Sequence, residues 1–432
     1  FLRNPERNFG IFMNADRLEL EGDEVRLIGR WFRSEEETVL STGRYSPDLD
    51  SFTLMIRGRT YDFDRVGDDP ASEYFARGRD PEAYRYLAPP ALADSWEVGT
   101  LADVGMSLEP LREMVETEID PPARSVHALY VHGVLIARHG KLVFEDYFHG
   151  FHRGRSHDTR SASKSATSFL VGAAIQAGEI AGTDLPVYET IGGDRFGAGL
   201  EPLARRVTLE HLLTMSSGLD CDDRDPDSPG NEDRLQSQSE NPDWYDYTLG
   251  LDMIRAPGER AVYCSAGSNL VGNVLAAASG ERLEDLFHRL VASPLDIDRY
   301  HLYLQPPGEP YMGGGIHWMP RDFLKLGQVI LDGGAWNGRR ILSEEFAARS
   351  ISDLYELRER GYGYLWWTID VPFRDRSVEV FFAGGNGGQV VMGVPELELL
   401  VSFFAGNYSD RVMFRIQEEL VPEYVLRAIV EE

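Results

Sequence analysis

The chain contains little cysteine and almost no lysine. Its 432 residues include two cysteines, Cys221 and Cys264, which are too few for a disulfide framework or a zinc cage. One bridge could form only if the fold brought them together, and we expect free thiols. The lysines are Lys141, Lys164 and Lys325, and the other basic side chains, histidine aside, are arginines. Because arginine stays protonated in proteins whereas a desolvated lysine can act as a base, the position of each lysine is informative.

Long hydrophobic runs are also missing. No window approaches the roughly 18 consecutive apolar residues of a membrane-spanning helix, so we expect no membrane span. The formal net charge is −28, from 71 acidic and 43 basic residues. Such a surface repels phosphate backbones and anionic lipids, so nucleic acid and acidic membranes are poor candidate partners. The chain opens at Phe1, and we expect a processed product. Its compartment stays open, with a periplasmic or secreted location preferred to a cytoplasmic one.

Two parts of the chain differ in their hydrophobic pattern. Residues 1–91 alternate apolar and polar side chains in short runs separated by turn signals, which predicts a β-rich accessory segment of unknown role. Residues 92–432 predict a larger unit with strands at both ends and helices between them, typical of an α+β fold with one antiparallel sheet. The predicted strands there are a hairpin over 127–151 and strands over 362–369, 378–382, 389–394 and 397–404. The predicted helices begin at Ser107 and cover 161–177, 209–215, 266–279, 282–290 and 321–331.

The first candidate for chemistry is Ser161-Ala162-Ser163-Lys164, at the start of an apolar helix. Positions three apart share one helical face, so the hydroxyl and the amine lie close enough to exchange a proton. The helix N-terminus offers free backbone N–H groups where a carbonyl oxygen would become negative. Desolvation favours the neutral form of a lysine, which could then take the serine proton.

Two further segments carry candidate site residues. Tyr263 follows the Pro257-Gly258 turn and precedes an apolar helix, a position from which a phenolate beside an ammonium could act as a general base. The run from Ala383 to Gly388 (AGGNGG) lies between two predicted strands, where dense glycines allow a ligand to approach the backbone closely. Each segment taken alone has an ordinary structural explanation, packing for the tyrosine and a hairpin turn for the glycines.

Other kinds of site find little support in the sequence. It contains no G-x-S-x-G nucleophile elbow, no H-E-x-x-H motif and no phosphate-binding loop. Six histidines fall between His127 and His157, including His149 and His152. Alternating strand positions and loop ends explain them more simply than ligation of a metal, and we predict no metal site.

Together these segments resemble the serine β-lactamase and penicillin-binding-protein superfamily. The most similar branch contains class C β-lactamases, family VIII carboxylesterases and 6-aminohexanoate-dimer hydrolases. The resemblance extends from about Leu92 to the C-terminus and does not cover residues 1–91. It is carried by residues 157–172, 207–219, 257–272, 313–334, 361–367 and 382–395.

The resemblance implies a β-lactamase/transpeptidase-like α+β fold, in which an antiparallel sheet is flanked by helices and a helical subdomain is inserted. It implies that Ser161 is the nucleophile, that Lys164 is its base partner and that Tyr263 is the tyrosine of the Y-x-N box. It implies no cofactor. The backbone N–H groups of Ser161 and Asn386 would form the oxyanion hole.

Two positions depart from the pattern of that superfamily. Ser265 stands where the Y-x-N box usually has asparagine, and Ala383-Gly384-Gly385 stands where a Lys/His-Thr/Ser-Gly box is usual. We assign substrate binding to Ser265, Gly384 and Gly385. The two glycines keep the close backbone approach, but the second box offers neither a cation nor a hydroxyl for a substrate carboxylate.

The sequence therefore predicts a serine hydrolase that cleaves an ester or amide bond of a small molecule through a Ser161 acyl-enzyme, as a carboxylesterase or a nylon-oligomer-type amide hydrolase does. The alternatives are a β-lactamase or D-Ala-D-Ala peptidase, or a non-catalytic binding protein on the same fold. We expect neutral, short-chain esters to be cleaved faster than penicillins or cephalosporins, unless an arginine from another loop replaces the missing cation. The oligomeric state stays open.

Overall fold

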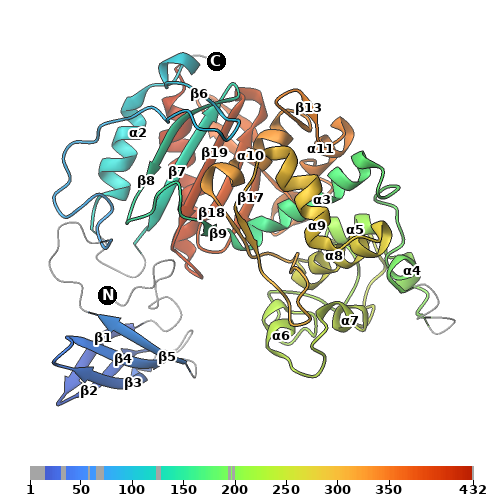
Figure 1. Ribbon diagram of the computed structural model, residues 1–432, viewed down its shortest axis with the longest axis horizontal. Helices are drawn as coiled ribbons and strands as arrows, with labels where there is room; N and C mark the ends of the chain where they lie inside the picture. The colour runs from blue at the N-terminus through green and yellow to red at the C-terminus, as the bar shows by residue number, and fades with distance from the viewer. Residues whose placement is uncertain are drawn as a thin grey trace.

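The computed structural model describes residues 15–30, 36–56, 59–64, 73–122, 128–192, 196 and 200–430. Among these residues the strands form a five-stranded sheet near the N-terminus and a separate nine-stranded sheet in the rest of the chain (Figure 1). The first contains β1 (Ala15–Glu21), β2 (Glu24–Gly29), β3 (Thr38–Ser46), β4 (Ser51–Ile56) and β5 (Arg59–Asp64). The second contains β6 (Glu97–Val98), β7 (Val131–Arg138), β8 (Lys141–Tyr147), β14 (Tyr355–Leu357), β15 (Arg360–Tyr362), β16 (Trp367–Phe373), β17 (Arg376–Gly385), β18 (Gln389–Val394) and β19 (Leu399–Ala405).

Distant parts of the chain complete the nine-stranded sheet. Its order is β14-β15-β16-β17-β18-β19-β7-β8-β6, and β19 pairs antiparallel with β7, so that Val401 lies opposite Ile136. The short strand β6 pairs parallel with β8 and closes one edge. Every residue of β7, β18 and β19 is buried, which requires cover on both faces of the sheet.

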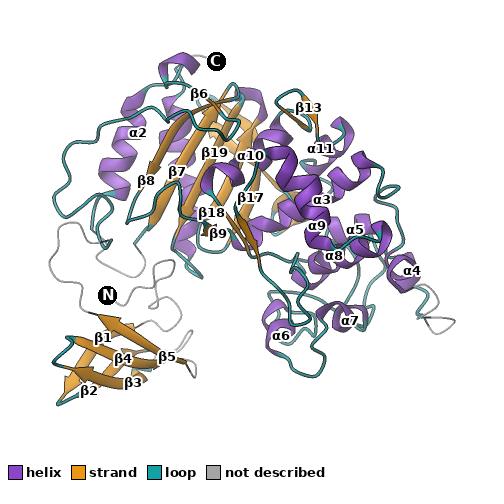
Figure 2. Ribbon diagram, viewed as in Figure 1, coloured by secondary structure: helices purple, strands orange, loops and turns teal. Residues whose placement is uncertain are grey.

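The described helices are concentrated between β9 (His157–Asp158) and β14 (Figure 2). The longest is α8 (Ser265–Ser279), which packs on α3, α4, α5 and α7. The other helices are α2 (Leu108–Met114), α3 (Lys164–Ala177), α4 (Val187–Gly192), α5 (Leu209–Leu213), α6 (Glu232–Ser237), α7 (Trp244–Leu249), α9 (Leu283–Phe287), α10 (Pro320–Leu331) and α11 (Glu344–Ser350).

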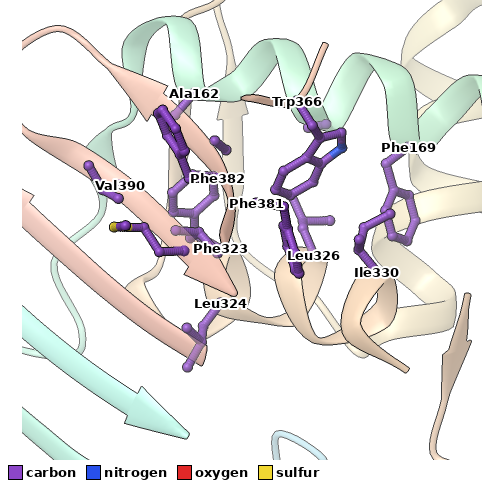
Figure 3. Packing of buried hydrophobic residues seen from close by; sticks show 14 of the residues in the cluster. Ala162, Phe169, Phe323, Leu324, Leu326, Ile330, Trp366, Phe381, Phe382 and Val390 are labelled. Atoms are coloured by element: carbon purple, nitrogen blue, oxygen red, sulfur yellow. The ribbon is translucent and has the colours of Figure 1, made fainter. Parts of the chain in front are cut away.

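Apolar packing between helices and sheet fixes the position of α3. Helix α10 packs on β7, β18 and β19, and its side chains share one buried cluster with Phe169 of α3 and Phe381 of β17 (Figure 3). Burial of one such side chain contributes about 1.5–3 kcal/mol. A helix held by many contacts of this kind is a rigid support for a residue at its N-terminal end.

The N-terminal sheet has a small core of its own, made of Val25, Leu27, Leu40 and Leu54. Residues 73–91 do not contribute to this small core, because their buried side chains Ala76 and Tyr84 belong to the core of the large unit. The small antiparallel sheet in the N-terminal segment is as predicted. The domain boundary after residue 91 stays a prediction.

The structure confirms the predicted fold class and most of the elements. Helix α2 begins after Ser107, whose hydroxyl accepts a hydrogen bond from the Glu109 N–H, and β7 and β8 form the predicted hairpin. The helix predicted over 161–177 differs at its start, where residues Arg160–Ser163 form a 3-10 turn (η3) before α3. The alternation of apolar and polar residues did not predict β3, which pairs with β2 through a register shift between Leu27 and Ile28.

The prediction of free thiols is wrong, because Cys221 and Cys264 form a disulfide. Cys221 lies in the loop after α5, and Cys264 directly precedes α8. The backbone N–H of Asp223 donates to the Tyr263 carbonyl at 3.0 Å, which holds the two segments side by side. Spacing along the chain could not reveal this contact, since the fold alone brings the two segments together.

Replacing both cysteines by alanine is expected to lower the free energy of unfolding by about 3–4 kcal/mol. The bridge closes a loop between positions 43 residues apart, and without it the unfolded chain gains the entropy of that loop. Urea unfolding of the double variant and the parent measures the difference. Equal unfolding free energies, together with two titratable thiols in the denatured parent without reductant, would show that the bridge does not form.

Candidate active site

A pocket of about 530 Å³ joins the predicted site segments. Ser161 from the turn before α3 and Tyr263 from the loop before α8 lie on its wall, together with Gly384, Gly385 and Asn386 at the end of β17. The structure therefore brings together the serine, the tyrosine and the glycine-rich segment, which lie more than a hundred residues apart along the chain.

Ser161 is presented by a turn with unusual backbone geometry. The preceding Arg160 has a φ of 50°, in the left-handed region that is sparsely populated by residues with a Cβ. Asp158 holds this conformation, since its carboxylate accepts the Arg160 backbone N–H at 2.9 Å and pairs with the Arg160 guanidinium at 2.8 Å. Such strain persists only where surrounding contacts enforce it, and it is common at functional positions.

Lys164 lies directly behind Ser161. Its Nζ is 3.3 Å from the Ser161 Oγ and donates a second hydrogen bond to the Gly313 carbonyl. The lysine side chain is fully enclosed, with 1% of its surface exposed. The predicted proximity of the amine and the hydroxyl is therefore present.

The charge of Lys164 differs from the expectation based on burial alone. Burial lowers the pKa of Lys164, but its electrostatic interactions with Tyr263, Glu232 and Asp223 raise it by more, and the net direction is upward. The amine is therefore an ammonium at neutral pH. The sequence could not show this, because Asp223 lies in a loop and Glu232 begins α6, and only the fold places both near Lys164.

Tyr263 lies between cations and aromatic rings. The Lys164 Nζ is 5.1 Å from the centre of its ring, the Arg358 guanidinium carbon is 4.2 Å away, and Trp367 stacks on the ring at 5.8 Å. Cations this close stabilise negative charge on the phenol oxygen. The arrangement suits a tyrosine that takes a proton from Ser161 while Lys164 stays charged.

Ser265 lies behind the pocket wall instead of on it. The residue is completely buried, and its hydroxyl and backbone N–H both donate to one oxygen of Asp223, at 2.6 and 2.9 Å. Burial raises the pKa of Asp223 to about 6, and Glu232 contributes to the rise, whereas Lys164 and Ser265 oppose it. Above that pH the Asp223 carboxylate is charged and favours the ammonium form of Lys164. Ser265 thus orients a carboxylate beneath the site, and its assignment to substrate binding stays untested.

Gly385 explains how close the sheet comes to the serine turn. A Cβ at this position would lie 2.2 Å from the Thr159 carbonyl oxygen and 3.1 Å from the Ala162 nitrogen. Because Gly385 has no side chain, the end of β17 can pack directly against the turn that carries Ser161. The neighbouring Asn386 binds Ser409 through its side chain, accepting the Ser409 N–H at 2.6 Å. Asn386 lines the same pocket as Ser161, and the oxyanion hole stays a prediction.

Sequence reasoning missed the arginines of this pocket. Arg224, Arg358, Arg360 and Arg411 line it, and each lies outside the recognised motifs. No local pattern marks them, because in a chain that uses arginine for nearly all its cations a single arginine in a loop carries no signal.

The predicted histidine cluster contains a buried hydrogen-bonded pair. The His132 Nδ1 lies 2.9 Å from the His157 Nε2, and Phe151 stacks on His132 at 4.0 Å. Burial lowers the pKa of His157 to about 3, so the ring is neutral at physiological pH. His127 lies outside the described residues. Within the described ranges, no three metal-ligating side chains gather into a cation site, and no helix is long and apolar enough to cross a bilayer.

The structure combines a sheet that is antiparallel apart from β6, a helical region beside it, and a pocket lined by Ser161 and Tyr263 with the buried Lys164 behind the serine, an arrangement typical of the β-lactamase fold. The Beta-lactamase family matches residues 125–414, which is more than half of the chain. The chain therefore belongs to that family.

The chain is similar to proteins described as hydrolases and to a penicillin-binding-protein homologue. The 6-aminohexanoate-dimer hydrolase of Paenarthrobacter ureafaciens is 26% identical over 219 residues, which cover 49% of this chain and 54% of that protein, so the match spans about half of the relative. The structure of EstCE1, a hydrolase with promiscuous acyltransferase activity, superposes with a TM-score of 0.57 at 18% identity, covering 77% of this chain and 100% of that one. An octameric penicillin-binding-protein homologue from Pyrococcus abyssi superposes with a TM-score of 0.51 at 18% identity, covering 73% of this chain and 77% of that one. These two likenesses show the fold.

Proposed function

We propose that this protein is a serine hydrolase that cleaves ester or amide bonds of small molecules through an acyl-enzyme on Ser161. The observation that carries the proposal is the contact of 3.3 Å between the Lys164 Nζ and the Ser161 Oγ in a pocket that also contains Tyr263. A non-catalytic binding protein would not need a fully buried lysine against a pocket-lining serine. The names of an aminohexanoate-dimer hydrolase and of a hydrolase with promiscuous acyltransferase activity among the similar proteins support a carboxylesterase-like or amide hydrolase.

The chemistry proceeds in two steps. The Ser161 Oγ attacks the substrate carbonyl carbon and passes its proton to the Tyr263 oxygen, while the Lys164 ammonium stabilises the resulting charges. Backbone N–H groups of Ser161 and Asn386 hold the oxygen that becomes negative. As the bond to the leaving group breaks, the leaving group takes the proton from Tyr263. Water then attacks the acyl-enzyme by the same route in reverse and releases the acid.

A fluorophosphonate probe tests this function directly. We expect the parent protein to gain the mass of one adduct, mapped by peptide mass spectrometry to Ser161, and the Ser161→Ala variant to gain none, because an activated serine alone attacks the phosphorus centre. Fragment ions that place the label on Ser163 or on Ser265 would contradict the assignment of the nucleophile, and no labelling of the parent would contradict the proposed function.

A β-lactamase or D-Ala-D-Ala peptidase is the second candidate. The family match and the arginines of the pocket favour it, whereas Ala383-Gly384-Gly385 lacks the cation and hydroxyl expected of such an enzyme. Hydrolysis of nitrocefin with a higher kcat/KM than that of p-nitrophenyl butyrate, in one buffer, would favour this candidate over the first.

A further inference from the structure

The wall of the active-site pocket carries an excess of positive charge. Four arginines line it (Arg224, Arg358, Arg360 and Arg411), against two carboxylates, Glu359 and Glu418. The chain as a whole has a net charge of −28. Its acidic surface repels anions at long range, but the electric field inside a narrow pocket depends on the charges of the wall.

Three of these arginines lack the ion pairs that a structural role would require. Among the described residues, Arg224, Arg358 and Arg411 form no ion pair and no side-chain hydrogen bond. Arg360 is the exception, because its guanidinium donates to the Gln417 Oε1 at 3.1 Å and lies 3.5 Å from a Glu418 oxygen. Arg224, Arg358 and Arg411 are exposed, so their guanidinium groups are accessible to an anion that enters the pocket, and among the described residues no carboxylate pairs with them.

Arg224 and Arg358 also lie close enough to repel each other. Burial lowers the pKa of Arg358, and the positive charge of Arg224 lowers it further, against the opposing effect of Tyr263 and Asp223. Two like charges that face one pocket attract an anion more strongly than either charge alone.

The turn that carries Arg358 has a backbone conformation that is unfavourable for arginine and glutamate. Arg358 and Glu359 connect β14 to β15 and have φ values of 56° and 63°. A two-residue hairpin turn with both residues in the left-handed region normally contains Asn-Gly or Asp-Gly. Here the turn keeps a long cationic side chain and places its guanidinium carbon 4.2 Å from the centre of the Tyr263 ring. Unfavourable backbone geometry that brings a charge to a site indicates a functional role for that charge.

We infer that this pocket selects substrates that carry a carboxylate away from the bond to be cleaved, with Arg358 as its principal contact and Arg224 and Arg411 as additional cations. A guanidinium binds a carboxylate through two parallel hydrogen bonds. The inference rests on the proposed function and names the substrate class of that site. It reverses the preference for neutral esters that the sequence predicted, since loops remote from Ala383-Gly384-Gly385 supply the missing cation.

Matched pairs of esters test the inference on the intact chain. The first pair places the charge in the acyl part: mono-p-nitrophenyl adipate against p-nitrophenyl hexanoate. The second places it in the leaving group: 3-carboxyphenyl butyrate against 3-carbamoylphenyl butyrate. For at least one pair we expect kcat/KM to be about tenfold or more higher for the anionic member. We expect that preference to fall as sodium chloride is raised, since salt screens the attraction.

Variants of the pocket arginines test whether these residues cause the preference for the anionic ester. Arg358→Gln is expected to reduce the anionic preference about tenfold or more, and Arg411→Gln, on a different element and without contact to Tyr263, is expected to reduce it in the same direction. Arg339→Gln in the short strand β13 (Arg339–Arg340) is the matched control, because Arg339 is exposed and does not line the pocket. The ratio within a pair is insensitive to loss of folded protein, so a destabilised variant still gives a valid result.

Three results would overturn the inference. Equal kcat/KM within both pairs, or an anionic preference unchanged by both arginine variants, would refute it while leaving the serine hydrolase intact. Failure to cleave any of the four esters, together with no fluorophosphonate labelling, would refute the proposed function itself and the inference with it.

Discussion

Ser161→Ala is expected to lower kcat for p-nitrophenyl butyrate by about 10⁴- to 10⁶-fold, the range seen when a nucleophile is removed from a serine hydrolase. Alanine keeps the backbone of the η3 turn and removes only the oxygen that lies 3.3 Å from the Lys164 Nζ. The activity that is left then comes from the oxyanion hole and from substrate positioning. Stopped-flow and steady-state assays with the parent at the same concentration measure the ratio.

A surface serine provides the control for this substitution. Ser352→Ala removes a hydroxyl that bonds the Ala348 carbonyl within one helical turn, and it should leave kcat unchanged. If Ser161→Ala retained more than about a tenth of the parental kcat, a different residue would have to act as the nucleophile. A tenfold change corresponds to about 1.4 kcal/mol, which is too little for the loss of covalent catalysis.

Lys164→Arg is expected to lower kcat by about 10²-fold or more, because displacing a catalytic group by about 1 Å can cost that much. Arginine keeps the positive charge, but its larger planar group does not fit the enclosed space of the lysine side chain, of whose surface 1% is exposed. The substitution therefore moves the charge away from the Ser161 Oγ, which the Lys164 Nζ contacts at 3.3 Å. The pH dependence of kcat and of kcat/KM, recorded for both proteins, measures the loss and shows which ionisation disappears.

The chain contains a natural control for this prediction. Lys141 at the start of β8 is partly exposed and pairs with Glu97 at 3.0 Å, so Lys141→Arg should keep the parental kcat. If Lys164→Arg also kept it, the position of the positive charge next to Ser161 would not contribute to the reaction.

Local patterns were sufficient to predict the elements that carry the site. Spacing of three residues placed Ser161 and Lys164 together, because α-helical and 3-10 turns both bring positions i and i+3 to the same side. The Pro-Gly turn predicted that Tyr263 follows a tight turn, the glycines around Asn386 predicted a close approach to the backbone, and both segments reach the pocket. These signals are local, since turn geometry and helical period depend on neighbouring residues alone.

The sequence by itself determined the fold class and identified Ser161 and Tyr263, which line the pocket, and Lys164, which contacts Ser161 from behind. Tertiary structure alone decided the charge of Lys164, the disulfide between Cys221 and Cys264, and the arginines that line the pocket. Those three features depend on distances between residues far apart in the chain, and electrostatic energy falls with distance in space, whatever the separation in sequence. Asp223 is 59 positions from Lys164, yet its carboxylate raises the pKa of that lysine. Arg358 likewise lies 95 positions from Tyr263 and 4.2 Å from its ring.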